Sequence, residues 1–567
     1  MLIDEKKLKS ILIDAGIVDE AAWEDVIKNA HRLEVSPEDI LRQKDIISGH
    51  LYYEILAKGL GVKYVNLKRL EVDEGVLDIF NGDTVNKYGA IPFEISKEKG
   101  LGRAKLKVAF TKQWDKQILR TLQIKAKRKI EPYLTDDISF RSIFVYYKKE
   151  VAEKLKVLID KKSHDHTQCE DCFDLLMEYC YYTRPSDIHV EEFANSGVVK
   201  FRIDGFLHDE FEMAPQLIQK LVEIIKKSSE TTTDEDNQTD DGRFSVEVFD
   251  EELAFRVSII PTYFGEKVCL RVLDDSKQKL SLHDLGFNDS DIVMLKKEFE
   301  KPYGLILING PTGSGKSTTL YSVLKFLNIE GTSIATIEDP VEYPIKHINQ
   351  SQVDEENGFT FSRGLKELLR QDPDIVVIGE IRDNETASIA VNAALTGHIV
   401  LSTIHSNTAV GTISRLENMG IPNYLLSPTL DLAISQRLIK KMCIYCRESF
   451  TPEKKYLDKL DRDVGVYASL AKLKKMGLIS YKTYKDIILF KNHGCPRCGG
   501  KGFTGRIGVF EILNSNKDIQ EMILTGKSES QIAKHAESQG MLTMFEDGLL
   551  KALNGMTTIE AVIDVVR

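Results

Sequence analysis

The 567-residue sequence has no long apolar run without charged residues. A helix needs about 20 consecutive apolar residues to cross a bilayer, and no stretch approaches that length. The segment Met1 to Glu20 places Asp4, Glu5 and Asp14 among its apolar residues, unlike the basic-then-apolar layout of a secretory signal. We therefore expect a cytoplasmic chain, in which any association with a membrane must go through a partner or the protein's own surface.

Cysteine is scarce, and there is no excess of basic charge. Eight cysteines are too few for a disulfide scaffold in a chain of this length. The net charge of −11 disfavours a general affinity for nucleic acid, so no nucleic-acid partner is expected. The basic cluster Lys125, Lys127, Arg128 and Lys129 is interpreted as a solvated strand or loop face.

Low-complexity tracts and solenoid repeats are also lacking, and 42% of the residues are hydrophobic, as in an ordinary soluble protein of several domains. The spacing of the apolar residues predicts the order of these domains along the chain. The predicted segments are a helical module over 1–60, an α+β module over 61–140, a helical connector over 141–171, a second α+β domain over 172–274, a parallel α/β domain over 282–442, a cysteine-rich lobe over 443–510 and a helical region over 511–567.

Short alternating runs predict the strands of the two α+β segments. The first segment has Ala90 to Ile95 and Leu106 to Phe110, and the second has Val198 to Ile203 and Leu253 to Ile259. The polar run Ser228 to Asp241 is linker-like in composition. We place it inside the second domain because strand patterns continue on both sides.

A phosphate-binding loop follows the apolar strand Leu305 to Ile308 and precedes a helix expected to begin near Lys316. Its sequence matches G-x-x-x-x-G-K-S, in which backbone N–H groups surround the β-phosphate, the lysine neutralises β/γ charge and the serine can ligate Mg²⁺. The residues expected to contact ATP are Gly310, Pro311, Thr312, Gly313, Ser314, Gly315, Lys316, Ser317 and Thr318.

Three further apolar strands end in polar residues, at Glu338, Glu380 and His405. Ligands of open α/β sheets lie beyond the carboxyl ends of the strands, so all three ends are expected near the phosphates. Glu380 is placed to hold Mg²⁺ with Ser317, and Glu338 to orient or deprotonate the attacking water. His405 would bond the γ-phosphate or couple hydrolysis to movement. A lone carboxylate at a strand end is usually a helix cap, but three coincident ends beside a phosphate loop favour catalysis.

Two Cys-x-x-Cys pairs, Cys443 with Cys446 and Cys495 with Cys498, supply four thiolates suited to a tetrahedral Zn²⁺ site. The 48 residues between Cys446 and Cys495 exceed the usual ribbon spacing. Zinc in small sites contributes on the order of 10 kcal/mol, so the lobe is expected to unfold without it. Four separate buried thiols are the alternative. A third pair, Cys169 and Cys172, has no second pair nearby and is read as incidental.

At these residues the chain resembles the type II/IV secretion ATPase superfamily, specifically its assembly branch, which drives type IV pilus assembly and type II secretion. The family's Asp box is similar to Thr336-Ile-Glu-Asp-Pro-Val-Glu342, its Walker B motif to Gly379-Glu-Ile-Arg-Asp-Asn-Glu-Thr386, and its His box to Thr396-Gly-His398 with Ser402-Thr-Ile-His405-Ser-Asn407. The resemblance implies a RecA-like ATPase domain that works as a homohexamer through a polytopic inner-membrane platform protein.

Upstream motifs resemble the PAS-like domain that precedes the ATPase domain in this family. They include Ser186-Asp-Ile-His-Val-Glu191 and Asp241-Gly-Arg243. The resemblance implies that Arg243 and Arg256 reach ATP and that Arg271 is a third such arginine. A guanidinium is a fixed cation suited to developing phosphate charge. Surface pairing with nearby carboxylates is the alternative.

The N-terminal helices resemble a module that in relatives docks on cytoplasmic assembly proteins and in some binds cyclic di-GMP. Here Lys7-Leu8-Lys9 replaces the Arg-Leu-Gly of the nucleotide-binding version, which disfavours cyclic di-GMP. Type IV pilus assembly is the leading function, and a type II secretion pseudopilus ATPase is the alternative. A nucleic-acid translocase with a zinc ribbon and a non-catalytic nucleotide-binding adaptor are less favoured.

Overall fold

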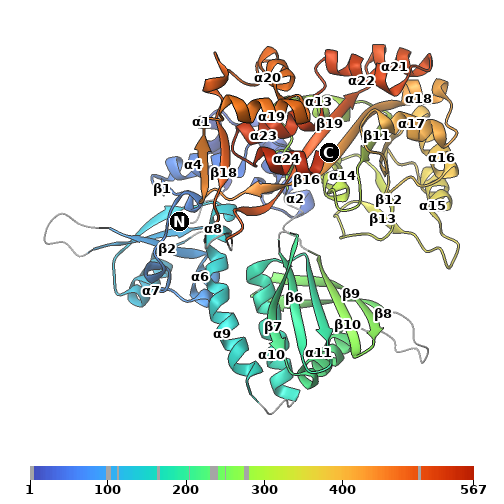
Figure 1. Cartoon of the computed structure of the whole chain (residues 1–567). Coiled ribbons are helices and arrows are strands. Elements are labelled where there is room, and N and C mark those ends of the chain that lie inside the picture. The colour runs from blue at the N-terminus through green and yellow to red at the C-terminus, as the bar shows by residue number, and fades with distance from the viewer. Residues whose placement is uncertain are drawn as a thin grey trace. The chain divides into compact units, whose positions relative to one another are not determined.

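The computed structural model describes residues 5–96, 104–111, 114–161, 166–203, 205–229, 240–249, 251–273, 280–495, 498 and 500–566 (Figure 1). The chain forms two compact units, Met1–Trp23 with Ile47–Asp275, and Glu24–Ile46 with Ser276–Arg567. Residues 1–60 are therefore shared between the two units. Within the described ranges, no helix is both long enough and apolar enough to cross a membrane.

The first unit contains a small sheet of strand order β1-β4-β3-β2. The strands predicted at Ala90–Ile95 and Leu106–Phe110 are confirmed with those bounds as β2 and β3, which pair antiparallel. Helix α4 packs on β1 and β4. The elements of this part are α1 (Glu5–Asp14), α4 (Gly49–Leu60), β1 (Lys63–Tyr64), α5 (Glu74–Leu77), α6 (Gly82–Tyr88), β2 (Ala90–Ile95), β3 (Leu106–Phe110), α7 (Lys116–Ala126), β4 (Ile130–Leu134) and α8 (Asp137–Phe144).

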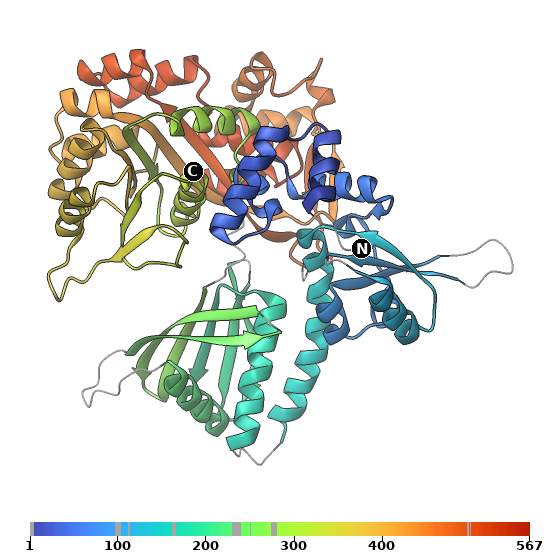
Figure 2. The same cartoon turned by 180° about the vertical axis from the view of Figure 1, so that it is seen from behind.

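A larger antiparallel sheet of order β7-β6-β5-β10-β9-β8 completes this unit. Buried and half-buried residues alternate along β9, so one face packs and the other stays accessible. The apolar stripe of α11 packs against β5, β6 and β10, and Figures 1 and 2 show α10 and α11 beside the sheet. The elements are α9 (Lys148–Ile159), α10 (His166–Thr183), β5 (Asp187–Glu192), β6 (Gly197–Ile203), β7 (Phe206–Met213), α11 (Pro215–Ser228), β8 (Asp240–Val248), β9 (Glu251–Thr262) and β10 (Gly265–Leu273).

The predicted strands Val198–Ile203 and Leu253–Ile259 lie within β6 and β9. Residues 230–239 of the predicted polar run lie outside the described part of the chain. On either side of them, α11 and β8 belong to the same domain, because both pack with this sheet.

The second unit is built on a seven-stranded sheet of order β13-β12-β14-β15-β11-β16-β19. All neighbours pair in parallel except β16 and β19, which are antiparallel. Strand β11 is buried at every residue, as expected for a parallel strand covered by helices on both faces. The strands are β11 (Gly304–Asn309), β12 (Ile334–Glu338), β13 (Asn349–Gln352), β14 (Ile375–Ile378), β15 (Ile399–Ile404), β16 (Leu430–Met442) and β19 (Phe503–Asn514).

Helices cover both faces of this sheet and enclose two apolar clusters. One cluster includes Leu295, Ile308 and Leu324, and the other includes Leu307, Ile378 and Leu416. The helices of this part are α12 (Leu282–Leu285), α13 (Asp289–Phe299), α14 (Lys316–Leu327), α15 (Phe361–Leu368), α16 (Asn384–Leu395), α17 (Gly411–Asn418) and α18 (Asn423–Thr429).

A third apolar cluster joins the cysteine-rich lobe to the last helices. Ile439 and Val509 of the β16–β19 ladder pack there with leucines of the helical insert and of α23. The elements are β17 (Arg447–Phe450), α19 (Lys454–Val464), α20 (Val466–Lys475), β18 (Leu489–Asn492), α21 (Lys517–Leu524), α22 (Glu529–Ser538), α23 (Met544–Leu553) and α24 (Ile559–Val566).

Residues 24–46, most of α2 (Glu20–Leu33) together with α3 (Pro37–Gln43), attach to the second unit by polar contacts. Arg32 Nη2 donates to Asn328 Oδ1 over 3.2 Å, and Arg42 pairs with Asp284 at 3.3 Å. Lys296 Nζ donates to the carbonyl of Lys44 over 2.7 Å. The attachment therefore depends on specific hydrogen bonds and an ion pair.

Candidate functional site: a phosphate-binding loop and a tetracysteine cluster

The phosphate-binding loop connects β11 to α14, and α14 begins at Lys316 as predicted. Gly310 and Gly315 have φ angles of 150° and 88°, which L side chains rarely adopt. A Cβ at Gly310 would lie 2.5 Å from the carbonyl oxygen of Gln436. These positions therefore need glycine both for the turn and for close approach to β16.

Gln436 of β16 supports the start of the loop helix. Its Oε1 accepts a hydrogen bond of 2.8 Å from Thr319 Oγ1, and both side chains are buried. Lys316 Nζ donates to the carbonyls of Gly310 and Pro311 over 2.9 and 3.2 Å. Burial lowers the pKa of Lys316, and the nearby Glu380 carboxylate opposes that shift.

The predicted strand-end residues lie at one edge of the sheet, because β12, β14, β15 and β11 are parallel neighbours. Glu380 Oε2 lies 3.3 Å from His405 Nε2, and Glu380 Oε1 is bound by Arg382. Arg382 also reaches Asp339 at 3.4 Å. The structure thus brings together Glu380, His405 and the loop lysine, with an arginine that the sequence analysis did not select.

Glu338 ends β12 and is only 5% exposed. Thr336 Oγ1 and Gln350 Nε2 donate to its Oε1 over 2.6 and 3.2 Å, and the Tyr321 hydroxyl donates to Oε2. None of these three donors was predicted from the sequence. Tyr321 lies four residues, about one helical turn, beyond Ser317 of the loop, and this spacing is a local signal that it faces the same edge.

Arg243, Arg256 and Arg271 form one row across the antiparallel sheet of the first unit. Arg256 is paired in register with Arg243 on one side and Arg271 on the other. Arg271 Nε lies 3.3 Å from Asp187 Oδ1. The three predicted arginines are therefore neighbours, and they belong to a different unit from the phosphate-binding loop.

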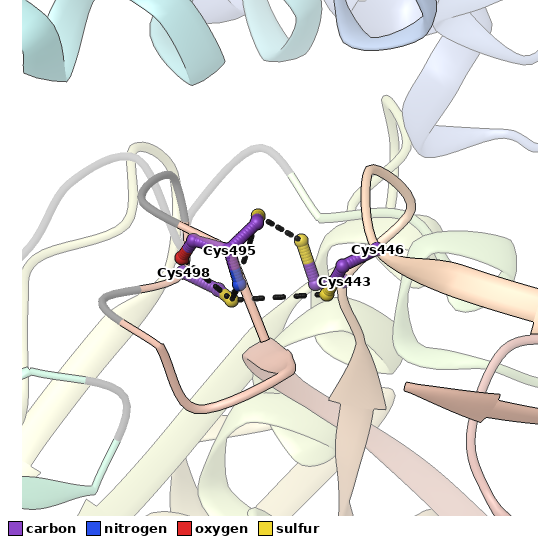
Figure 3. Close-up of side chains that lie close together, drawn as sticks. All are labelled: Cys443, Cys446, Cys495 and Cys498. Atoms are coloured by element: carbon purple, nitrogen blue, oxygen red, sulfur yellow. Dashed lines mark hydrogen bonds between the residues drawn. The ribbon is translucent and has the colours of Figure 1, made fainter. Parts of the chain in front are cut away.

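The four cysteines of the lobe converge, and all four sulfur atoms lie within 4.8 Å of one another (Figure 3). The Sγ atoms are 3.8 Å apart for Cys443 and Cys495, 3.9 Å for Cys446 and Cys498, and 3.7 Å for Cys495 and Cys498. A tetrahedral ion with metal–sulfur bonds of about 2.3 Å requires sulfur–sulfur distances of about 3.8 Å. The cluster therefore fits a tetrahedral metal ion.

A pair of strands brings the two Cys-x-x-Cys pairs together despite the long spacing between them. Strands β17 and β18 pair antiparallel, with Arg447 opposite Asn492, so the chain just after Cys446 lies beside the chain just before Cys495. The helical insert is looped out between them. On the other side, Met442 is paired with Phe503.

Backbone groups also surround one of the thiols. The N–H groups of Cys495 and Gly502 donate to Cys498 Sγ over 3.2 and 3.1 Å. Burial raises the pKa of Cys498, but these N–H donors and the hydrogen bonds of the Cys495 and Cys446 thiols together outweigh it and hold the pKa below its ordinary value. Such donors stabilise the thiolate, which is the form that binds metal.

The parallel sheet, its glycine loop and the carboxylates at the same edge define a P-loop nucleotide-binding protein. The type II/IV secretion system protein family matches residues 162–564. The chain is 33% identical over 530 residues to the type IV pilus assembly ATPase PilB of Myxococcus xanthus, covering 90% of each chain. It is 39% identical over 382 residues to the type II secretion system protein E of Pseudomonas aeruginosa, covering 67% of this chain and 72% of that one.

Among solved structures, the ATPase DotB of Yersinia pseudotuberculosis aligns with a TM-score of 0.51 at 20% identity, over 69% of this chain and 92% of that one. This likeness concerns the fold. The chain belongs to the type II/IV secretion system protein family and to its assembly branch. The Myxococcus xanthus relative, which is aligned over 90% of both chains, is an ATPase, so ATPase activity in general follows for this chain.

Proposed function

We propose that this chain is a hexameric motor that hydrolyses ATP to drive pilin polymerisation in type IV pilus assembly. The observation that supports it most directly is the convergence of Lys316, Glu338, Glu380 and His405 at one sheet edge. The whole-length similarity to a pilus assembly ATPase, at 90% of both chains, favours pilus assembly over the type II secretion alternative, for which similarity covers 67% of this chain.

In this proposal the loop residues Gly310 to Thr318 hold ATP, and Ser317 and Glu380 supply the hydroxyl and carboxylate ligands for the accompanying Mg²⁺. Glu338 takes a proton from the attacking water. His405, which lies beside Glu380, contacts the γ-phosphate and couples its hydrolysis to movement of the loop that follows. Arg243 and Arg256, with Arg271 beside them, act on ATP bound by a neighbouring subunit. The four cysteines hold a structural Zn²⁺.

The partners proposed are further copies of the chain, a polytopic inner-membrane platform protein, and a cytoplasmic assembly protein that docks on the N-terminal region. The motor acts in the cytoplasm at the inner face of the membrane. Nucleic acid and cyclic di-GMP are not among the proposed partners. Deletion of the gene in its native host would remove surface pili if pilus assembly is correct, and would block protein secretion if the alternative is correct.

The test of the enzyme is Mg²⁺-dependent ATP hydrolysis, measured together with oligomeric mass. We expect Lys316→Ala, Glu338→Gln and Arg243→Ala each to abolish turnover in folded rings. Mixing Lys316→Ala with Arg243→Ala subunits is expected to restore activity, because some sites then combine an intact loop with an intact neighbouring arginine. Mixing Lys316→Ala with Glu338→Gln subunits is the control, in which no activity should be restored. Hexamers that bind ATP without turnover would refute the autonomous motor.

A further inference from the structure

The Glu338 carboxylate has few acceptor sites left. An ionised carboxylate offers about four, two on each oxygen. Thr336 and Gln350 occupy both sites of Oε1, and Tyr321 occupies one site of Oε2. Among the residues that the structure describes, no other donor reaches this carboxylate, so a single acceptor site remains, and it lies on Oε2.

The direction of the Tyr321 hydrogen bond is fixed by its surroundings. The hydroxyl oxygen accepts from the Glu342 N–H over 3.3 Å, and a carboxylate can only accept, so the hydroxyl proton points to Glu338. Burial raises the pKa of Tyr321, which keeps the hydroxyl protonated. The Tyr321 ring packs on Tyr343 with centroids 4.6 Å apart.

The donors come from three elements. Tyr321 lies on α14, which begins at the phosphate-binding loop, whereas Thr336 and Gln350 lie on β12 and β13. Gln350 also accepts from the Ile345 N–H over 2.7 Å and donates to the Tyr343 carbonyl over 3.2 Å. The same side chains therefore fix the carboxylate relative to the loop helix and hold the segment that follows Glu338.

We propose that Tyr321, Thr336 and Gln350 are positioning residues that orient Glu338 and leave one acceptor site on Oε2 for the attacking water. This inference rests on the proposed role of Glu338 as base. The water gives a proton to Oε2 as its oxygen bonds to the γ-phosphorus. The bond from γ-phosphorus to the β–γ bridging oxygen breaks, ADP leaves with that electron pair, and Glu338 returns the proton to phosphate or solvent.

The test compares kcat and the KM for ATP in variants that remove one donor each. Thr336→Val removes the hydroxyl at nearly constant volume, Thr336→Ser keeps it, and Tyr321→Phe removes the phenol hydroxyl. We expect Thr336→Val and Tyr321→Phe to lower kcat by about 10- to 100-fold, with KM changed by less than about threefold. Thr336→Ser should recover most of the rate.

Ser322→Ala is the matched control, because Ser322 lies on the same helix as Tyr321 and also carries a buried hydroxyl. That hydroxyl donates to the carbonyls of Leu280 and Thr318 and not to Glu338. It should keep the wild-type kcat.

Wild-type kcat in both Tyr321→Phe and Thr336→Val would overturn the positioning role, as would a loss confined to KM. The result for Glu338→Gln separates this inference from the proposed function. If Glu338→Gln keeps full turnover, the base assignment itself is wrong. If Glu338→Gln is inactive while the donor variants turn over normally, only the positioning role is wrong.

Discussion

Lys551 and Asp547 form an ion pair on α23 in which each side chain is 2% exposed. Asp547 also accepts from the Phe510 N–H over 2.8 Å and from Asn288 Nδ2 over 2.9 Å. Lys551 lies 5.4 Å from the centre of the Phe510 ring. The pair thus ties α23 to β19 and to the start of α13.

Replacing Lys551 with methionine keeps most of the side-chain volume but leaves the Asp547 carboxylate buried with neutral donors alone. Removing one partner of a buried pair costs about 3–5 kcal/mol. We expect the melting temperature of this unit to fall by about 5–15 °C. The additional change Asp547→Asn removes the unpaired charge and should recover part of the loss.

The assay is differential scanning calorimetry with and without ADP, since a nucleotide that binds the folded second unit raises its transition and so identifies it. Lys491→Met is the control, because the Lys491–Glu448 pair is 58% and 60% exposed and contributes less than about 1 kcal/mol. Equal melting temperatures for Lys551→Met and the control would refute the assignment of a large cost to the buried charge.

Three further predictions follow from buried or specific contacts. Burial, reinforced by the Asp547 carboxylate, raises the pKa of Asp291 from 3.8 to about 6. The folded chain therefore holds this proton more tightly than the unfolded chain does, so the free energy of unfolding falls as the pH rises from about 4 to about 6. Asp291→Asn should therefore raise the melting temperature at pH 7.5 and leave it unchanged at pH 4, and equal effects at both pH values would contradict this. Cys446→Ser should reduce bound zinc from about one per chain to near zero by elemental analysis, because a tetrahedral site needs all four thiolates. The sequence alone predicted that the lobe unfolds without zinc, but the lobe shares a buried apolar cluster with β16, β19 and α23. We therefore expect hydrogen exchange to increase around both cysteine pairs while that cluster stays protected. Retention of zinc would exclude a tetrahedral four-cysteine site. Arg32→Ala should increase hydrogen exchange over residues 24–46, whereas Lys28→Ala, which removes an exposed pair with Glu330, should not, and identical exchange in the two variants would argue against an Arg32 anchor.

Local patterns in the sequence were sufficient to predict the elements that carry the site. The strands ending at Glu338, Glu380 and His405 are runs of apolar residues, and a buried parallel strand requires such a run whatever lies around it. The phosphate loop is equally local, because its glycines and lysine lie within eight consecutive residues. The two Cys-x-x-Cys pairs could be recognised for the same reason.

Only the tertiary structure decided which distant residues meet. The β17–β18 pair bridges the 48 residues between the cysteine pairs, a gap longer than the usual ribbon spacing. The donors to Glu338 come from α14 and β13 as well as β12. A tyrosine, a threonine and a glutamine have no periodic signature, so their partners depend on how strands and helices are brought together. Residues 24–46 likewise showed an ordinary helical pattern, and their attachment to the second unit depends on single hydrogen bonds that sequence periodicity does not record.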